Sequence, residues 1–368
     1  MIDPVRPEVG PSIQEAHDAG IRVVMTTGDH IDTAVAIARE LGIISDRSQA
    51  ITGSELDKLS DEELAEKIAN YGVYARVQPE HKVRIVEAWK AQDQIVAMTG
   101  DGVNDAPSIK RADIGIGMGI TGTDVTKNVA DMVLADDNFA TIVTAVEEGR
   151  HVYDNIRKAI QFLLSSNIAE VIAVFVATMV GFVILEPVHL LWINLITDCF
   201  PALALGMEKA EPGVMRRQPR KASDGIFAGG MGVDVVFQGV IISLMTLASY
   251  FIGIQHQFGT IDLGFIANNP EAGIEGMTMA FLTLSMVEMF HSFNMRSRRQ
   301  SIFKLGNQNP WLWGSFALSL VLTYVVIEVP AVAAIFGFAE LDMPNYLMAM
   351  GLAFLIIPIM EIYKACWR

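Results

Sequence analysis

Three carboxylates lie inside long apolar stretches of the sequence, where they could bind a cation. Glu170, Asp198 and Glu288 fall within stretches of about 20 residues, the length that crosses a bilayer. A charge at the bilayer centre costs about 2.5–3.5 kcal/mol on insertion scales, so such residues usually mark an ion path. Asn167 precedes Glu170 by three residues and Asn194 precedes Asp198 by four, so each pair shares a helix face. We predict a cation site lined by Asn167, Glu170, Asn194, Thr197, Asp198 and Glu288.

The predicted ligands are all oxygen atoms, from carboxylates, amide carbonyls and a hydroxyl. Such a set suits hard cations such as Ca²⁺, Na⁺ or K⁺, whereas Cu⁺ or Zn²⁺ would call for Cys or His. Several negative charges at one depth favour a divalent ion. The alternative is that these polar residues only hold helices together. That explains Asn194 or Thr197, but not three carboxylates near the middle of the bilayer.

Six apolar stretches predict six transmembrane helices, over roughly 159–185, 188–207, 230–254, 277–295, 311–336 and 343–363. Pro201 follows Asp198 closely, so the second span is expected to be broken and to offer free carbonyls. Lys and Arg occur after the second and fourth spans and in the tail, but not after the first, third or fifth. By the positive-inside rule, the head before residue 159 and the carboxy terminus are cytoplasmic.

Residues before the spans alternate between predicted strands and helices. Strands are expected over 21–25, 74–77, 94–98 and 114–118, with a helix over 32–41 and another from about residue 106. This alternation predicts a doubly wound parallel sheet with ligands at the carboxyl ends of its strands. Both Thr-Gly-Asp loops, 27–29 and 99–101, fall at that edge.

The same edge carries side chains suited to phosphoryl transfer. Asp101 and Asp105 could bind Mg²⁺, which takes one or two carboxylates together with phosphate oxygens. The Thr27 hydroxyl and the Lys82 ammonium would offset phosphoryl charge, with Asn104 nearby. The alternative is that Gly-Asp and Asn-Asp merely form turns. The longer string from Thr99 to Pro107, TGDGVNDAP, is far more specific.

Composition supports a head joined to a membrane domain. The chain of 368 residues is 51% apolar and 19% charged, with a net charge of −15. Residues 1–158 hold 16 basic and 27 acidic side chains, so a nucleic-acid partner, which needs a basic face, is not expected. Cys199 and Cys366 form no CxxC, which argues against a disulfide scaffold or a zinc ribbon.

TGDGVNDAP resembles the hinge signature of the P-type ATPases, whose catalytic domain has a haloacid-dehalogenase-like fold. Within that family, the sequence most closely resembles the sarco/endoplasmic-reticulum-type calcium pumps and their bacterial relatives. Asn194 distinguishes the chain from sodium/potassium pumps, Glu170 from plasma-membrane-type calcium pumps, and the lack of Cys-Pro-Cys from heavy-metal pumps. Further matches, in chain order, are Asp3–Arg6, Thr27–Asp29, Arg76–Lys82, Ser165–Asn167 and Trp192–Asp198.

The resemblance implies a role for each predicted site residue. Lys82 would contact an aspartyl phosphate and Thr27 its oxygens, within a catalytic set that includes Gly28, Asp29 and Asn104. Asp101 and Asp105 would hold Mg²⁺. ATP would be the substrate of the full-length pump and Ca²⁺ the transported ion. The six polar residues of the spans would line the calcium sites.

The family's phosphorylated Asp-Lys-Thr-Gly motif does not occur in this sequence. We therefore expect a carboxy-terminal part of a pump, inactive alone, with a partial phosphorylation domain over 1–150 and an all-α six-helix transmembrane domain over 151–368. Its expected partners are the lipid bilayer and the missing amino-terminal part of the same pump. Two alternatives stay open: a membrane-anchored phosphatase of the same fold, and a non-enzymatic partner of an intact pump.

Overall fold

The computed structural model describes residues 5–366, apart from residues 222, 260, 263, 265, 267–272 and 307. The chain divides into two compact units, which we call the α/β unit and the membrane unit. The α/β unit is Met1–Arg150 with Pro212–Asp224, and the membrane unit is His151–Glu211 with Gly225–Arg368. The short motif at Asp3–Arg6 lies partly outside the described residues, because Asp3 and Pro4 are not among them.

Within the described part of the α/β unit, six short strands form two sheets with the orders β1-β3-β2 and β4-β5-β6. All four strand pairings are parallel, as the alternation of strands and helices predicted, although the strands form two sheets rather than one. Val73, Tyr74 and Ala75 of the central strand β3 are fully buried. The strands are β1 (Met25–Thr27), β2 (Ala50–Thr52), β3 (Val73–Ala75), β4 (Ala97–Gly100), β5 (Ile114–Met118) and β6 (Met132–Leu134).

Helices connect successive strands of the α/β unit. The predicted helix over 32–41 is confirmed by α2, and the one expected from about residue 106 is confirmed by α6. The helices are α1 (Val9–Asp18), α2 (Ile31–Glu40), α3 (Gly53–Leu56), α4 (Asp61–Lys67), α5 (Pro79–Ala91), α6 (Ala106–Arg111) and α7 (Asp124–Val129). Short 3₁₀ turns are η1 (Arg47–Gln49), η2 (Ile68–Asn70), η3 (Val103–Asp105) and η5 (Val214–Arg216).

Three predicted strands differ in their bounds from the observed strands, and one is confirmed. The strand expected over 74–77 is β3, which runs over Val73–Ala75. β5 matches the strand expected over 114–118, but β1 and β4 begin four and three residues later than 21 and 94. Ile21 and Val23 instead pack on the cluster around Val143, away from the sheet. Just before β4, the Val96 N–H donates to the Asp113 carboxylate and the Asp113 N–H donates to the Val96 carbonyl, each at 2.9 Å. The N–H of Val96 therefore bonds a side chain and not a neighbouring strand.

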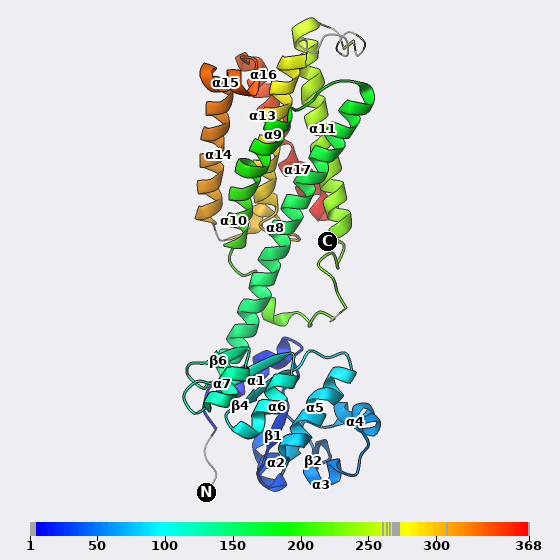
Figure 1. Cartoon of the computed structure of the whole chain (residues 1–368), viewed down its shortest axis with the longest axis vertical. Helices are drawn as coiled ribbons and strands as arrows, with labels where there is room; N and C mark the ends of the chain where they lie inside the picture. Colours follow the sequence, from blue (N-terminus) through cyan, green and yellow to red (C-terminus); the bar gives the residue numbers. More distant parts are fainter. Residues whose placement is uncertain are drawn as a thin grey trace. The chain divides into compact units, whose positions relative to one another are not determined.

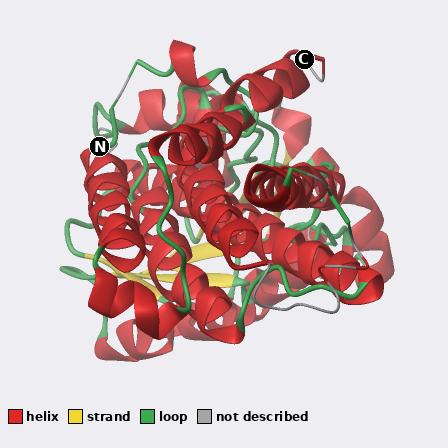
Figure 2. Cartoon of the chain, turned by 90° about the horizontal axis from the view of Figure 1, so that it is seen from above, coloured by secondary structure: helices red, strands yellow, loops and turns green. Residues whose placement is uncertain are grey.

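The membrane unit is all helical, and its helices run alongside one another (Figure 1). Several of them are viewed almost end-on in Figure 2, where helices clearly outnumber strands. The long helix α8 begins in the α/β unit and continues into this one. Its elements are α8 (Phe139–Val180), α9 (Pro187–Trp192), η4 (Ile193–Asp198), α10 (Cys199–Gly206), α11 (Met231–Phe258), α13 (Ile274–Asn294), η7 (Ile302–Lys304), α14 (Pro310–Glu328), α15 (Pro330–Phe336), α16 (Met343–Phe354) and α17 (Ile356–Cys366).

Among the described residues, five helical segments are long and apolar enough to cross a membrane. They correspond to five of the six predicted spans and show that the protein is an integral membrane protein. The helix α13 is long enough, at 21 residues, but is not one of the five. It carries Glu275, Glu288 and His291, and it packs against α11, α14, α16 and α17. A sixth span at α13 stays a prediction.

Three spans are interrupted. The segment of the second span that holds Asp198 is a π-helix, η4, between α9 and α10, so the expected irregularity is real but lies before Pro201. Pro330 separates α14 from α15, because proline cannot supply the N–H that a continuous helix needs. α16 and α17 meet at Leu355.

Two glycines allow α11 and α13 to approach each other closely. A Cβ on Gly253 of α11 would lie 2.8 Å from the Cα of Gly276 and 3.0 Å from the Sδ of Met279. A Cβ on Gly314 of α14 would meet nothing within 4 Å. The α11–α13 contact therefore depends on the absence of a side chain at residue 253.

We expect Gly253→Ala to destabilise the protein by about 1–3 kcal/mol, because the added methyl group overpacks this contact. Gly314→Ala is the matched control, since it makes the same change inside a helix with open space and should be neutral or stabilising. Thermal unfolding in detergent measures both. Equal unfolding temperatures for the two variants would show that the contact is not tight.

Candidate functional site

The carboxyl edges of the two sheets are joined by an ion pair. Lys82 lies in the first turn of α5, which follows β3, and Asp105 lies in η3, which follows β4. The Nζ of Lys82 is 2.5 Å from the Oδ1 of Asp105, and both side chains are largely buried. The structure thus brings together two predicted site residues that are 23 positions apart in the sequence.

The first Thr-Gly-Asp loop is held against the end of β3. Asp29 N–H donates to the Thr27 hydroxyl at 3.1 Å. The backbone N–H groups of Val77 and Arg76 donate to the carbonyls of Thr27 and Asp29, at 3.2 and 3.1 Å. Gly28 is exposed. The loop is therefore fixed through its backbone, with the Thr27 hydroxyl at the carboxyl end of β1.

The second Thr-Gly-Asp loop places two carboxylates four residues apart. A Cβ on Gly100 would lie 2.4 Å from the Cβ of Asp105, so only glycine fits there. Asp105 also accepts a hydrogen bond from Gly102 N–H at 3.3 Å, whereas Asp101 and Asn104 are exposed. In the part of the chain that the structure describes, no three His, Cys, Asp or Glu side chains gather into a metal site. Asp101 and Asp105 fit Mg²⁺, which needs only one or two carboxylates beside phosphate oxygens.

In the membrane unit, a serine hydroxyl joins two buried carboxylates. The Oγ of Ser166, in α8, donates to Asp198 Oδ1 at 3.0 Å and is also hydrogen-bonded to Glu288 Oε1. Thr197 donates to the other oxygen of Glu288 at 2.9 Å. Asp198 is 1% exposed and Glu288 0%. Asp198 Oδ2 is buried without a hydrogen-bond partner, so one carboxylate oxygen is left to bind a ligand.

A second contact extends this cluster along α8. The Nδ2 of Asn194 donates to both oxygens of Glu170, at 3.0 and 2.9 Å. Asn194, Thr197 and Asp198 all belong to the π-helix η4. We call Ser166, Glu170, Asn194, Thr197, Asp198 and Glu288 the intramembrane cluster. Five of its six members are predicted ligands.

Asn167 is the predicted ligand that the structure does not bring into the cluster. Its side chain is exposed and donates to the carbonyl of Leu163, one turn back in the same helix, at 2.8 Å. Ser166 takes the position nearer to Asp198 and Glu288. The sequence held a signal for it, because Ser166 precedes Glu170 by four residues and so shares its helix face.

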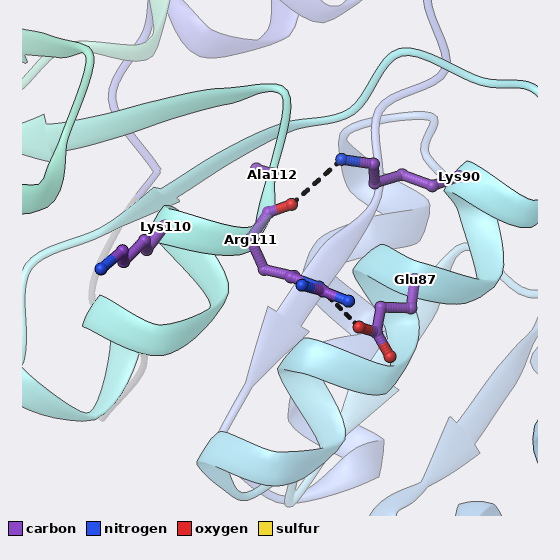
Figure 3. Close-up of a pocket in the computed structure, with 5 residues that line it drawn as sticks. All are labelled: Glu87, Lys90, Lys110, Arg111 and Ala112. Atoms are coloured by element: carbon purple, nitrogen blue, oxygen red, sulfur yellow. Dashed lines mark hydrogen bonds and ion pairs between the residues drawn. The ribbon is translucent and has the colours of Figure 1, made fainter.

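A pocket of about 710 Å³ lies elsewhere on the α/β unit, at the far end of α5 from Lys82 (Figure 3). Three of its four charged side chains, Glu87, Lys90 and Arg111, take part in ion pairs. Arg111 bonds Glu87 at 2.6 Å, and Lys90 donates to the Arg111 carbonyl at 3.2 Å (Figure 3). Lys90 also pairs with Asp113, at 2.9 Å. Burial raises the pKa of the Asp113 carboxyl, but the hydrogen bond and charge of Lys90 and the N–H of Val96 together outweigh it and lower the pKa overall. The pocket is a salt-bridged surface depression and does not belong to the predicted site.

Comparison with known protein families identifies the family to which the chain belongs. The family model described as cation transporting ATPase, C-terminus, matches residues 182–366, half of the chain. The chain belongs to the cation-transporting ATPases. The model described as haloacid dehalogenase-like hydrolase matches residues 1–113, which confirms the fold predicted for the α/β unit of this cation-transporting ATPase.

Curated relatives match nearly all of the chain. "Calcium-transporting ATPase 1" of Bacillus cereus is 48% identical over 99% of the chain and 41% of its own length. The calcium-transporting ATPase of Bacillus subtilis is 43% identical over 96% of the chain and 38% of its own. "Calcium-transporting ATPase 1" of Lactococcus lactis is 44% identical over 99% and 40%. The chain thus spans about two fifths of the length of these relatives.

We expect Ser166→Ala to destabilise the protein by about 1–3 kcal/mol, because two buried carboxyl groups then lose the hydroxyl that bonds them both. Ser292→Ala is the control: Ser292 is also buried, but its hydroxyl bonds only the Met289 carbonyl of its own helix, at 2.7 Å. Thermal unfolding in detergent compares the two. A smaller loss at Ser166 than at Ser292 would contradict the bridging role.

Proposed function

We propose that this chain forms the carboxy-terminal part of an ATP-driven pump that exports Ca²⁺ from the cytoplasm. The observation that carries the proposal is the unpartnered Oδ2 of Asp198 beside Glu288, at the centre of the intramembrane cluster. Buried charges are costly unless a counter-ion compensates them. Three carboxylates with hydroxyl and amide oxygens provide the charge and the ligand type that Ca²⁺ takes. The names of the curated relatives support the same ion.

The α/β unit has the groups needed to handle a phosphoryl group on an aspartate. Lys82 neutralises phosphoryl charge and the Thr27 hydroxyl bonds its oxygens, while Asp101 and Asp105 hold Mg²⁺. When bound, Mg²⁺ stabilises the negative charge that develops on the transferred phosphoryl oxygens. Gly28 leaves the approach to Thr27 open, and Asn104 lies exposed at the same edge. In this proposal ATP is the phosphoryl donor.

The amino-terminal part of the pump would supply the phosphorylated aspartate. Among the described residues, β1 and β4 each pair with a strand on one side only. β1 is only partly buried along its whole length, whereas β3 is completely buried. A strand paired with β1 or β4 would end at the edge that carries Lys82 and Asp105. We infer that the missing segment binds there.

The charge pattern gives the orientation. Lys209, Arg216 and Arg220 lie between α10 and α11, and Arg298 and Lys304 between α13 and α14. By the positive-inside rule these connections, the α/β unit and the carboxy terminus face the cytoplasm. The alternative is a phosphatase that uses the helices only as a membrane anchor. Its catalytic edge could also face the cytoplasm, but this alternative does not explain the buried carboxylates.

The first test concerns phosphorylation. The chain is joined to the amino-terminal part of the Bacillus cereus relative to give a completed pump, which should form an acid-stable phosphoenzyme with ATP, Mg²⁺ and Ca²⁺. Asp101→Asn and Lys82→Ala should each lower phosphorylation at least about 100-fold, because charge on the transferred group is then unbalanced. Lys110→Ala, in the pocket of Figure 3, is the control and should leave phosphorylation unchanged.

The 368-residue chain alone should incorporate no phosphate, since it contains no Asp-Lys-Thr-Gly. Stoichiometric labelling of the chain alone, or normal phosphorylation of both variants, would overturn the assignment of this edge.

The second test concerns the ion. In the completed pump, Asp198→Asn keeps the side-chain volume but removes one charge, so it should abolish Ca²⁺-dependent phosphorylation by ATP. Glu170→Gln should act similarly. Phosphorylation by inorganic phosphate without Ca²⁺ should persist, because that reaction uses Lys82 and Asp101. The measurement is phosphoenzyme level against free Ca²⁺.

Glu328→Gln is the matched control for the ion test, because Glu328 is exposed at the last residue of α14. It should keep the Ca²⁺ midpoint of the unmodified pump. An unchanged midpoint in Asp198→Asn and Glu170→Gln would remove the intramembrane cluster as the calcium site.

A further inference from the structure

A carboxylate outside the predicted catalytic set holds the turn that follows β5. Asp137 accepts hydrogen bonds from three consecutive backbone N–H groups, those of Gly119 at 2.6 Å, Ile120 at 3.0 Å and Thr121 at 2.7 Å. The Thr121 hydroxyl donates to it as well, at 2.8 Å. Four donors on one side chain fix this turn more firmly than the backbone alone could.

The backbone on both sides of this contact is unusually constrained. Asp137 has φ of 50°, in the left-handed region that non-glycine residues rarely adopt. A Cβ on Gly119 would lie 2.3 Å from the Leu134 carbonyl oxygen, and one on Gly122 would lie 2.0 Å from that of Met118. Strained backbone of this kind persists only where surrounding contacts determine it, and it often accompanies function.

The turn leads directly to the residues that hold Asp101. Thr123, the N-cap of α7, donates its backbone N–H to the Asp101 carbonyl at 2.9 Å. The Thr126 hydroxyl lies 3.4 Å from the same carbonyl oxygen. The backbone of Asp101, the proposed Mg²⁺ ligand, is therefore held by Thr123 and Thr126. These residues directly follow the turn that the Asp137 carboxylate holds.

We propose that Asp137 is a positioning residue for the Mg²⁺ site: by fixing the turn at 119–122 it places Thr123 and Thr126 to hold Asp101 for metal binding. This inference rests on the proposed phosphoryl-transfer function of the same edge. Partners that orient metal ligands are often worth 10–100-fold in metal affinity. Asp137 acts through Asp101 and contacts neither the metal nor the phosphoryl group.

The charge state of Asp137 agrees with this role. Burial raises the pKa of its carboxyl, but the N–H groups of Ile120 and Thr121, the Thr121 hydroxyl and the N–H of Gly119 outweigh it and lower the pKa to about 2. The carboxylate is ionised throughout the physiological range and accepts all four hydrogen bonds.

The test compares Asp137→Asn with Asp136→Asn. Asparagine tolerates a left-handed backbone, so Asp137→Asn keeps the fold of the chain and removes only the charge and part of the acceptor capacity. Asp136 is the adjacent control: it bonds the N–H of Asn138 and the Thr141 hydroxyl, at 3.2 and 2.6 Å, and not the β5 turn.

Hydrogen exchange on the 368-residue chain gives the first measurement. In Asp137→Asn the amides of Ile120, Thr121 and Thr123 should exchange about tenfold faster, whereas in Asp136→Asn they should not change; the Gly119 amide also bonds the Leu134 carbonyl, at 2.8 Å, and stays protected in both. Unchanged exchange at Thr123 in Asp137→Asn would overturn the link to Asp101. This result does not depend on catalysis, so it decides the link even if the completed pump forms no phosphoenzyme and the proposed function fails.

Mg²⁺ dependence gives the second measurement. In the completed pump, Asp137→Asn should raise the Mg²⁺ concentration for half-maximal phosphorylation by inorganic phosphate about tenfold, and saturating Mg²⁺ should restore the maximal level. A loss of phosphoenzyme without a shift in this concentration would show a purely structural role and would overturn the proposal.

Discussion

The burial of carboxylates among the membrane helices is the constraint on which the rest of the membrane unit depends. Asp198 and Glu288 are almost completely inaccessible, and a buried charge is tolerated only where donors or counter-ions compensate it. Ser166 and Thr197 supply donors from α8 and from η4. The helix α13, which carries Glu288, meets the same constraint through burial, because every residue from Gly276 to Met289 is buried.

Side chains of the π-helix η4 form hydrogen bonds with carboxylates on two different helices, α8 and α13. In η4, Asn194 bonds Glu170 of α8 while Thr197 bonds Glu288 of α13. A π-helix has a wider turn than an α-helix, and such turns are frequent at functional sites. The carbonyl of Asn194 accepts a hydrogen bond from the Cys199 thiol, five residues later, at 3.3 Å. The irregular turn thus joins the two ends of the cluster.

The sequence predicted the parts of the structure that depend on residue type and spacing. Intramembrane carboxylates identified five of the six cluster residues, and strand–loop–helix alternation predicted the parallel pairing. It could not predict which of Ser166 and Asn167 faces the cluster, because both lie within one turn of Glu170 and the packing against η4 and α13 decides between them. The strand starts were also missed, since Ile21 and Val23 have strand propensity but are held by tertiary contacts.

The edge of the α/β unit that carries Lys82 and Asp105 follows the same electrostatic rule as the intramembrane cluster. Lys82 and Asp105 neutralise each other at 2.5 Å in a site where both are largely buried. Under the proposed function, a phosphoryl group that binds Lys82 competes with Asp105 for the ammonium, and the carboxylate then needs another cation. Mg²⁺ at Asp105 supplies that charge, so entry of the phosphoryl group at Lys82 and of the metal at Asp105 should favour each other. Under the proposed function, the ion pair therefore balances the charge of Lys82 against that of Asp105 until both ligands arrive, which is why these two residues are bonded to each other in the structure.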